Sequence, residues 1–175
     1  MSVINRRTLM GAALTMGAAL SSSVQAKPRI GQPAPKFSLT TFDQKTIRLT
    51  DLIGKVVVLN YWAVWCGPCK QELPEIDAYV RRHVGDDLKV FAVTIDDAVS
   101  NKDLKPLATT LSFPLARYIN GRGYGPIDGA IPSNYVIDRS GVLRYARANA
   151  FNYGTFDQLI TPLLAEKPVQ TPPAV

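Results

Sequence analysis

Residues 55–70 read KVVVLNYWAVWCGPCK and contain both cysteines of the 175-residue chain, Cys66 and Cys69. The run from Lys55 to Val64 is apolar and rich in β-branched residues, which is typical of a strand buried on both faces. From Pro68 onward apolar residues recur at helical spacing, at Cys69, Leu73, Ile76, Val80 and Val84. Cys66 is therefore predicted to lie where a buried strand passes into an amphipathic helix.

The spacing of the two cysteines indicates redox chemistry. They are two residues apart and have no other cysteine to pair with, which favours an active pair over a structural cross-link. Unsatisfied N–H groups and the helix dipole at such a helix start stabilise a thiolate by up to ~2 kcal/mol. Cys66 is therefore expected to be nucleophilic near neutral pH. Pro68 is tolerated in the first helical turn, where its missing N–H would have no partner.

The first 26 residues are interpreted as a secretory signal. Arg6 and Arg7 precede a mild apolar run over 9–20, and small residues lead to a cleavage site after Ala26. That run is 12 residues long, shorter than the ~20 that a spanning helix needs. The paired arginines resemble a twin-arginine signal, although an ordinary Sec signal also carries basic residues. The protein is thus expected to be periplasmic, without stable membrane insertion after cleavage.

The rest of the chain predicts one domain over residues 27–166 and a disordered tail over 167–175, which contains three prolines. The whole chain carries a formal net charge of +6, and removing Arg6 and Arg7 with the signal lowers it to +4. Because the remaining charges are scattered, nucleic-acid binding is not expected.

Strands and helices alternate through this domain, which is typical of a sheet covered by helices. Asp96 and Asp97 are interpreted as polar residues at the end of a strand, not as a catalytic carboxylate pair. The other expected elements are a hairpin of 37–40 and 46–49, a turn over 50–54 capped by Thr50 or Asp51, a strand over 88–95, a helix from a Ser100 or Asn101 cap to 111, a short extended piece over 113–116, a hairpin of 133–137 and 142–146, and a helix over 154–165 capped by Thr155.

The motif WCGPC after a buried strand, followed later by Ile131-Pro132 before a hairpin, resembles thioredoxin-fold proteins. The narrower resemblance is to the exported TlpA/ResA-like family, which includes the cytochrome c maturation reductases. It rests on IGQPAPKF at 30–37, GKVVVLNYWA at 54–63 and IDRSG at 137–141, and it covers about residues 30–165. It implies an α/β, thioredoxin-like fold: a central mixed β-sheet flanked by helices, with an N-terminal β-hairpin extension.

The resemblance also implies roles for individual residues. Cys66 would attack a substrate disulfide and Cys69 would resolve the mixed disulfide. The pair would therefore alternate between two thiols and a redox-active Cys66–Cys69 disulfide. Glu72 matches an acidic residue that would exchange a proton with Cys69. From its spacing, Glu72 borders the buried face of the helix, so an exposed glutamate is the alternative. The residues expected to form the substrate surface are Trp65, Gly67, Pro68, Ile131 and Pro132, with Pro132 expected to follow a cis peptide bond.

Three further positions bear on this resemblance. Asn60 stands where general thioredoxins place a buried aspartate, so the usual proton acceptor is absent. Ser133 follows the proline where many relatives have threonine, and its expected effect is confined to substrate contacts. Pro74 matches the proline that kinks the active-site helix in the family.

The expected function is that of a thiol-disulfide oxidoreductase that reduces disulfides in other periplasmic proteins, such as apocytochrome c or metal-site assembly proteins. Its electrons would come from a membrane thiol protein of the DsbD or CcdA kind, and no cofactor is expected. Thiol oxidase or isomerase action and a non-catalytic binding domain remain alternatives. A peroxiredoxin site would need threonine in place of Ala63.

A copper-binding assembly protein on the same fold is the alternative from another class. Such proteins bind metal through two cysteines and a histidine, and His83 is the one histidine of the chain. If Cys66 and His83 lie on one helix, the 17 positions between them span ~25 Å, too far for a shared metal ion. No metal site is therefore expected.

Overall fold

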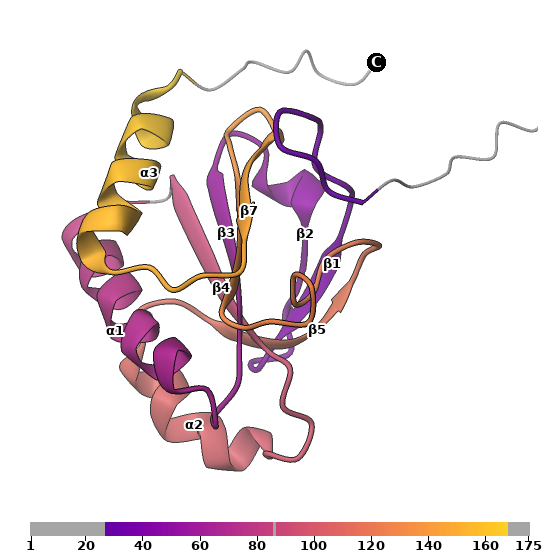
Figure 1. The fold of residues 1–175 in the computed structure, drawn as a ribbon, viewed down its shortest axis with the longest axis vertical. Coiled ribbons are helices and arrows are strands. Elements are labelled where there is room, and N and C mark those ends of the chain that lie inside the picture. The colour runs from indigo at the N-terminus through magenta and orange to yellow at the C-terminus, as the bar shows by residue number, and fades with distance from the viewer. Residues whose placement is uncertain (1–26, 86, 168–175) are drawn as a thin grey trace, which may run out of the picture.

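The computed structural model describes residues 27–85 and 87–167, so the expected signal over 1–26 and all of the expected tail over 167–175 except Lys167 lie outside the described residues. A seven-stranded mixed sheet forms the centre, in the order β2-β1-β5-β4-β3-β6-β7 (Figure 1). In chain order the elements are β1 (Ser38–Thr41), β2 (Thr46–Arg48), the 3-10 helix η1 (Leu49–Leu52), β3 (Val56–Trp62), α1 (Gly67–Arg82), β4 (Leu88–Thr94), α2 (Asn101–Thr110), β5 (Leu115–Asn120), β6 (Ser133–Ile137), β7 (Leu143–Arg147) and α3 (Tyr153–Ala165).

Strand β3 lies near the middle of the sheet, and all seven of its residues are buried. It pairs in parallel with β4 and antiparallel with β6, which the hairpin of β6 and β7 places on its other side. This accounts for its largely apolar sequence, because a strand covered on both faces has no side that faces solvent. Residues 63–66 then carry the chain from the end of β3 into α1.

Two apolar cores lie on the two faces of the sheet. The first joins β-strand residues such as Val58 and Trp62 to side chains of α1, α2 and α3, which lie along the same side of the sheet in Figure 1. The second joins Leu59 and Tyr61 to the β1–β2 hairpin, to η1 and to the loop before β6. The mixed sheet, the helical cover and the N-terminal hairpin confirm the expected fold class.

The sequence prediction was wrong about where several elements begin and end. Helix α1 ends at Arg82, and Val84 is 90% exposed instead of extending the apolar stripe. Asn152, not Thr155, is the N-cap of α3: its Oδ1 accepts from the Thr155 N–H, and Thr155 Oγ1 accepts from the Asn152 N–H. Asp51 likewise accepts from the N–H of Arg48 from inside η1. Such errors arise because several polar residues near a helix start can each supply a capping oxygen.

Strand β5 extends to Asn120, four residues beyond the expected extended piece, because β1 pairs along it over 116–120. Ser100 is confirmed as the N-cap of α2, with its Oγ accepting from the Asp103 N–H. No helix in the described ranges is both long enough and apolar enough to cross a membrane.

Asp77 fastens α1 to the segment that follows α2. Its Oδ1 accepts from both the N–H and the hydroxyl of Ser112 at 2.6 Å, and its Oδ2 accepts from Arg81 Nε at 2.6 Å. Burial raises the pKa of Asp77, but the hydrogen bonds from Ser112 and Arg81 outweigh it and hold that pKa below the ordinary value of 3.8.

Candidate active site

The two cysteines form a disulfide at the N-terminus of α1, with the sulfur atoms 2.05 Å apart. Cys66 is the N-cap residue, and its Sγ accepts a hydrogen bond from the Cys69 N–H at 3.2 Å. Pro68 occupies the first turn, as expected from its missing N–H. Cys69 is completely buried, whereas Cys66 keeps 5% of its surface exposed. Cys66 is therefore the more exposed of the two residues, and Cys69 is fully covered.

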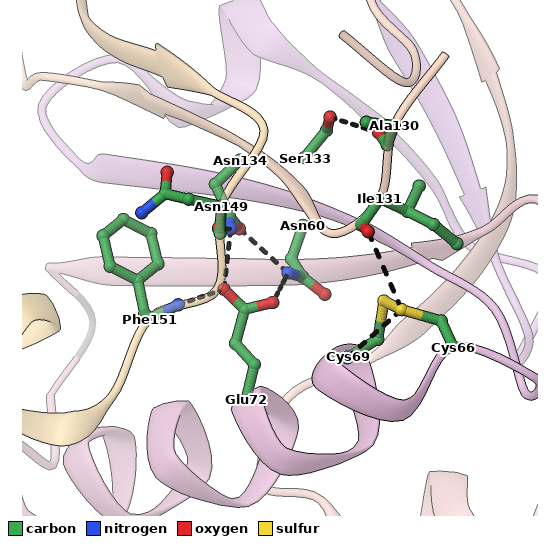
Figure 2. Close-up of a disulfide and its surroundings, with 10 residues drawn as sticks. All are labelled: Asn60, Cys66, Cys69, Glu72, Ala130, Ile131, Ser133, Asn134, Asn149 and Phe151. Atoms are coloured by element: carbon green, nitrogen blue, oxygen red, sulfur yellow. Dashed lines mark hydrogen bonds between the residues drawn. A yellow bond between two sulfur atoms is a disulfide. The ribbon is translucent and has the colours of Figure 1, made fainter.

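The expected substrate surface is only partly on the outside. Trp65 is 67% exposed, and Gly67 and Pro68 are exposed beside it. The Ile131–Pro132 peptide bond is cis, as the resemblance implies, and the Ile131 carbonyl oxygen lies 3.8 Å from Cys66 Sγ (Figure 2). Pro132 itself is buried and Ile131 is half-buried. Ile131 is thus the part of this loop that borders the reactive sulfur.

Ser133 does not face the substrate, which corrects the sequence interpretation. It is completely buried, its hydroxyl donates to the Ala130 carbonyl at 2.7 Å, and its Oγ accepts from the Ile127 N–H at 2.8 Å. The side chain therefore braces the loop that carries Ile131 and Pro132. Pro74 lies inside α1, as expected.

Glu72 is completely buried on α1, three residues after Cys69, so the alternative of an exposed glutamate was wrong. Residues at this spacing lie on the same helix face with Cβ atoms about 5–6 Å apart. Its carboxyl group accepts three hydrogen bonds, from Asn134 Nδ2 at 2.7 Å, from the Phe151 N–H at 2.8 Å and from Asn60 Nδ2 at 2.7 Å (Figure 2).

The same contacts decide the acidity of Glu72. Burial raises its pKa from 4.5 to about 6, because a carboxylate loses the hydration it has in water. The hydrogen bonds from Phe151, Asn134 and Asn60 act in the opposite direction, since they stabilise the ionised form. At neutral pH the group is mostly ionised and can therefore act as a base, and its raised pKa makes it a stronger base than an exposed glutamate.

Asn60 and Asn134 face each other across the antiparallel pair of β3 and β6, directly above Glu72. Asn60 Nδ2 donates to Asn134 Oδ1 at 2.8 Å, and Asn134 Nδ2 donates to the Asn149 carbonyl at 3.0 Å. The sequence reasoning identified Asn60 but missed Asn134 and the Phe151 N–H. Two polar amides within largely apolar strands were the available signal, because buried amides need partners.

His83 and Asp96, two further candidates, have contacts of their own. His83 follows α1 at its far end, stacks on Tyr79 with ring centroids 3.9 Å apart, and is exposed. Asp96 is buried and accepts from the Ala98 N–H, as expected of a polar residue at a strand end. Within the residues that the structure describes, no three His, Cys, Asp or Glu side chains form a group that could hold a metal ion.

Comparison with known proteins agrees with this geometry. Residues 30–146 match the AhpC/TSA family. The thioredoxin-like protein YneN of Bacillus subtilis is 37% identical over 117 residues, which are 65% of this chain and 68% of YneN. The thiol-disulfide oxidoreductase ResA of Bacillus anthracis is 32% identical over 122 residues, which are 66% of this chain and 67% of ResA.

A solved structure shows the same fold. The thiol:disulfide interchange protein of Chlorobium tepidum, a thioredoxin family protein, is 25% identical and superposes with a TM-score of 0.63. That match covers 80% of this chain and all of the other. With its CxxC pair at the start of α1, this chain belongs to the AhpC/TSA family and is a thiol-disulfide oxidoreductase of the thioredoxin type.

Proposed function

We propose that the protein is an exported reductase that breaks disulfides in other exported proteins. The observation that carries this proposal is the buried Glu72 carboxyl group beside the completely buried Cys69, behind a Cys66 that a substrate can reach. This arrangement suits a directional reaction, in which one sulfur attacks and the other waits for the substrate to bind.

In the reduced protein the Cys66 thiolate attacks a sulfur of the substrate disulfide, and the departing substrate sulfur leaves with the electron pair. The Cys69 thiol then gives its proton to Glu72, and the resulting thiolate attacks Cys66. This closes the Cys66–Cys69 disulfide and releases the second substrate sulfur as a thiolate. The ionised Glu72 supports this second step, because a buried thiol otherwise keeps its proton.

The substrate surface would consist of Trp65, Gly67, Pro68 and the Ile131–Pro132 loop. The exposed indole of Trp65 offers apolar contact area next to Cys66. The half-buried Ile131 places a main-chain carbonyl beside the sulfur, where an extended peptide could approach. Protein disulfides are therefore the proposed substrates, with apocytochrome c and metal-site assembly proteins as candidates.

The export and the electron supply are proposed on other grounds. The charged, apolar and small-residue regions over 1–26 support a cleaved signal, and the resemblance to the exported TlpA/ResA-like family agrees with it. In an oxidising compartment a reductase must be reduced again after each turnover. A membrane thiol protein of the DsbD or CcdA kind is the proposed donor.

The direction of electron flow is tested by the reduction potential of the Cys66–Cys69 pair, measured against glutathione. We expect a value close to the about −270 mV of thioredoxin, and a value close to the about −120 mV of DsbA would overturn the reductase assignment. In cells, alkylation of free thiols should find the pair mostly reduced.

The roles of the two sulfurs are tested separately by trapping. Cys69→Ser should accumulate mixed disulfides with client proteins, because the resolving thiol is gone. The matched variant Cys66→Ser should accumulate none, since Cys69 is completely buried. Equal trapping by both variants would show that the two sulfurs do not have separate roles.

A further inference from the structure

The three hydrogen bonds to Glu72 are divided unequally between its two oxygens. Oε1 accepts from both Asn134 Nδ2 and the Phe151 N–H, which use the two lone pairs that a carboxylate oxygen offers. Oε2 accepts from Asn60 Nδ2, its one hydrogen-bond partner among the described residues, and so keeps a lone pair. In Figure 2, Oε1 lies toward Phe151 and Oε2 lies on the side of the disulfide.

The orientation of the Asn60 amide satisfies Glu72 but leaves the amide's own oxygen without a partner. Its NH₂ group faces two acceptors, Glu72 Oε2 and Asn134 Oδ1, so reversing the amide would place oxygen against oxygen twice. In the observed orientation Asn60 Oδ1 is buried and has no hydrogen-bond partner in the described part of the chain. A buried, unpaired amide oxygen is costly and calls for an explanation.

We propose that Asn60 is a positioning residue that holds Glu72 Oε2 as the atom that takes the Cys69 proton, while Asn134 occupies Oε1. This proposal rests on the proposed role of Glu72 as proton acceptor. In the step, the Cys69 S–H bond breaks and an O–H bond forms at Oε2. The electron pair left on Cys69 forms the bond to Cys66, and the bond from Cys66 to the substrate breaks with its pair on the substrate sulfur.

The two amides are therefore expected to affect the reaction differently. Replacing either asparagine by alanine removes a hydrogen bond from the ionised carboxylate and should raise the pKa of Glu72. Without Asn134, Oε2 is still held by Asn60, so the maximal rate of the Cys69 step should be kept. Without Asn60, Oε2 is no longer held toward Cys69, and the maximal rate itself should fall.

The experiment uses the reduced mature protein and dithiobis(nitrobenzoate), which releases one coloured thiolate when Cys66 reacts and a second when Cys69 resolves the adduct. The variants are Asn60→Ala and Asn134→Ala. Asn149→Ala is the matched control, because its side chain bonds Tyr145 and only its main-chain carbonyl contacts Asn134. The carbon-13 shift of the Glu72 carboxyl group in the oxidised protein reports its pKa independently of activity.

The rate of the second phase is measured as a function of pH. In both test variants the midpoint of this pH profile should rise by about one pH unit or more, and the pKa read from the carboxyl shift should rise with it. Asn60→Ala should also lower the plateau of the profile, which is the maximal rate of the second phase, about tenfold. Asn134→Ala should leave this maximal rate unchanged. The first phase and the control should not change. In a Glu72→Gln background, neither asparagine substitution should alter the second phase further.

Two results would overturn the positioning role. One is an unmoved midpoint in both variants, and the other is a loss of plateau in Asn134→Ala as large as or larger than in Asn60→Ala, because the reaction would then not depend on Oε2 in particular. Failure of the proposed acceptor role looks different, because Glu72→Gln would then leave the second phase as in the wild type. If an alanine variant does not fold, Asn60→Leu and Asn134→Leu, which keep a similar side-chain volume but have no donor, are compared in the same way.

Discussion

The burial of Glu72 predicts a specific pH dependence of stability, which Glu72→Gln should remove. The pKa of Glu72 is raised from 4.5 to about 6 on folding, with burial as the largest cause. The folded protein therefore holds this proton more tightly than the unfolded chain does between these two values. As pH rises from about 4.5 through about 6, the wild type should lose stability, and above that range the loss should stay constant.

The size of this effect follows from the two values. One pKa unit corresponds to about 1.4 kcal/mol, so the rise from 4.5 to about 6 corresponds to about 2 kcal/mol of stability lost between acid and neutral pH. Glutamine has no proton to lose in this range. The stability of Glu72→Gln relative to the wild type should therefore increase by about 1.5 kcal/mol between pH 4.5 and pH 7.5, since the unfolded chain is already half ionised at pH 4.5.

The assay is urea unfolding of both proteins with the disulfide intact, at several pH values across this range. Absolute stabilities are not compared, because the glutamine NH₂ group also faces the Asn60 donor. Glu75→Gln is the matched control: it lies on the exposed side of the same helix, and its carboxylate accepts a hydrogen bond from the Tyr153 N–H. If wild type and Glu72→Gln run parallel from pH 4.5 to 7.5, the reasoning about Glu72 is refuted.

Three further predictions concern stability and are measured by urea unfolding. Asp77→Asn should lower the free energy of unfolding by about 1–3 kcal/mol at pH 7, because it weakens three short hydrogen bonds. The stability difference between wild type and variant should shrink as pH falls below 3.8 toward the lowered pKa of Asp77, and an unchanged difference at pH 3 would contradict this prediction. Ser100→Ala should cost about 1 kcal/mol through loss of the α2 cap, and no loss would argue against that cap. Gly123→Ala should lower the free energy of unfolding more than Gly129→Ala does. Both residues have positive φ, which costs an alanine about 1–2 kcal/mol, but only at Gly123 would the new Cβ clash with the Cδ of Pro28. Equal losses would show that this contact relaxes freely.

Much of the fold could be predicted from short segments of sequence. The strand β3 and helix α1 differ in hydrophobic period, and the change of period occurs at Cys66. A buried strand and an amphipathic helix each carry their pattern within a dozen residues, so no distant partner is needed to recognise them. The hairpin of β6 and β7 was predicted in the same way, from alternation around a turn that contains glycine.

The errors share a physical cause. Val84 continues the helical spacing of α1, but the helix ends at Arg82 and Val84 is exposed. The burial of a residue beyond the helix end depends on the rest of the domain and not on the local spacing. The spacing of Glu72 placed it only at the border of the apolar face. Its complete burial depends on donors 12, 62 and 79 residues away along the chain.

The sequence by itself therefore determined the redox pair, its place at a helix start and the class of fold, because each rests on local spacing and residue type. Only the tertiary structure decided which cysteine is the more exposed, that Glu72 is buried, and which of its oxygens keeps a lone pair. Those properties arise where β3, β6 and the segment before α3 meet above α1. Hydrogen bonds between segments so far apart leave no periodic signal in the sequence, although they decide the pKa of the carboxyl group beside Cys69.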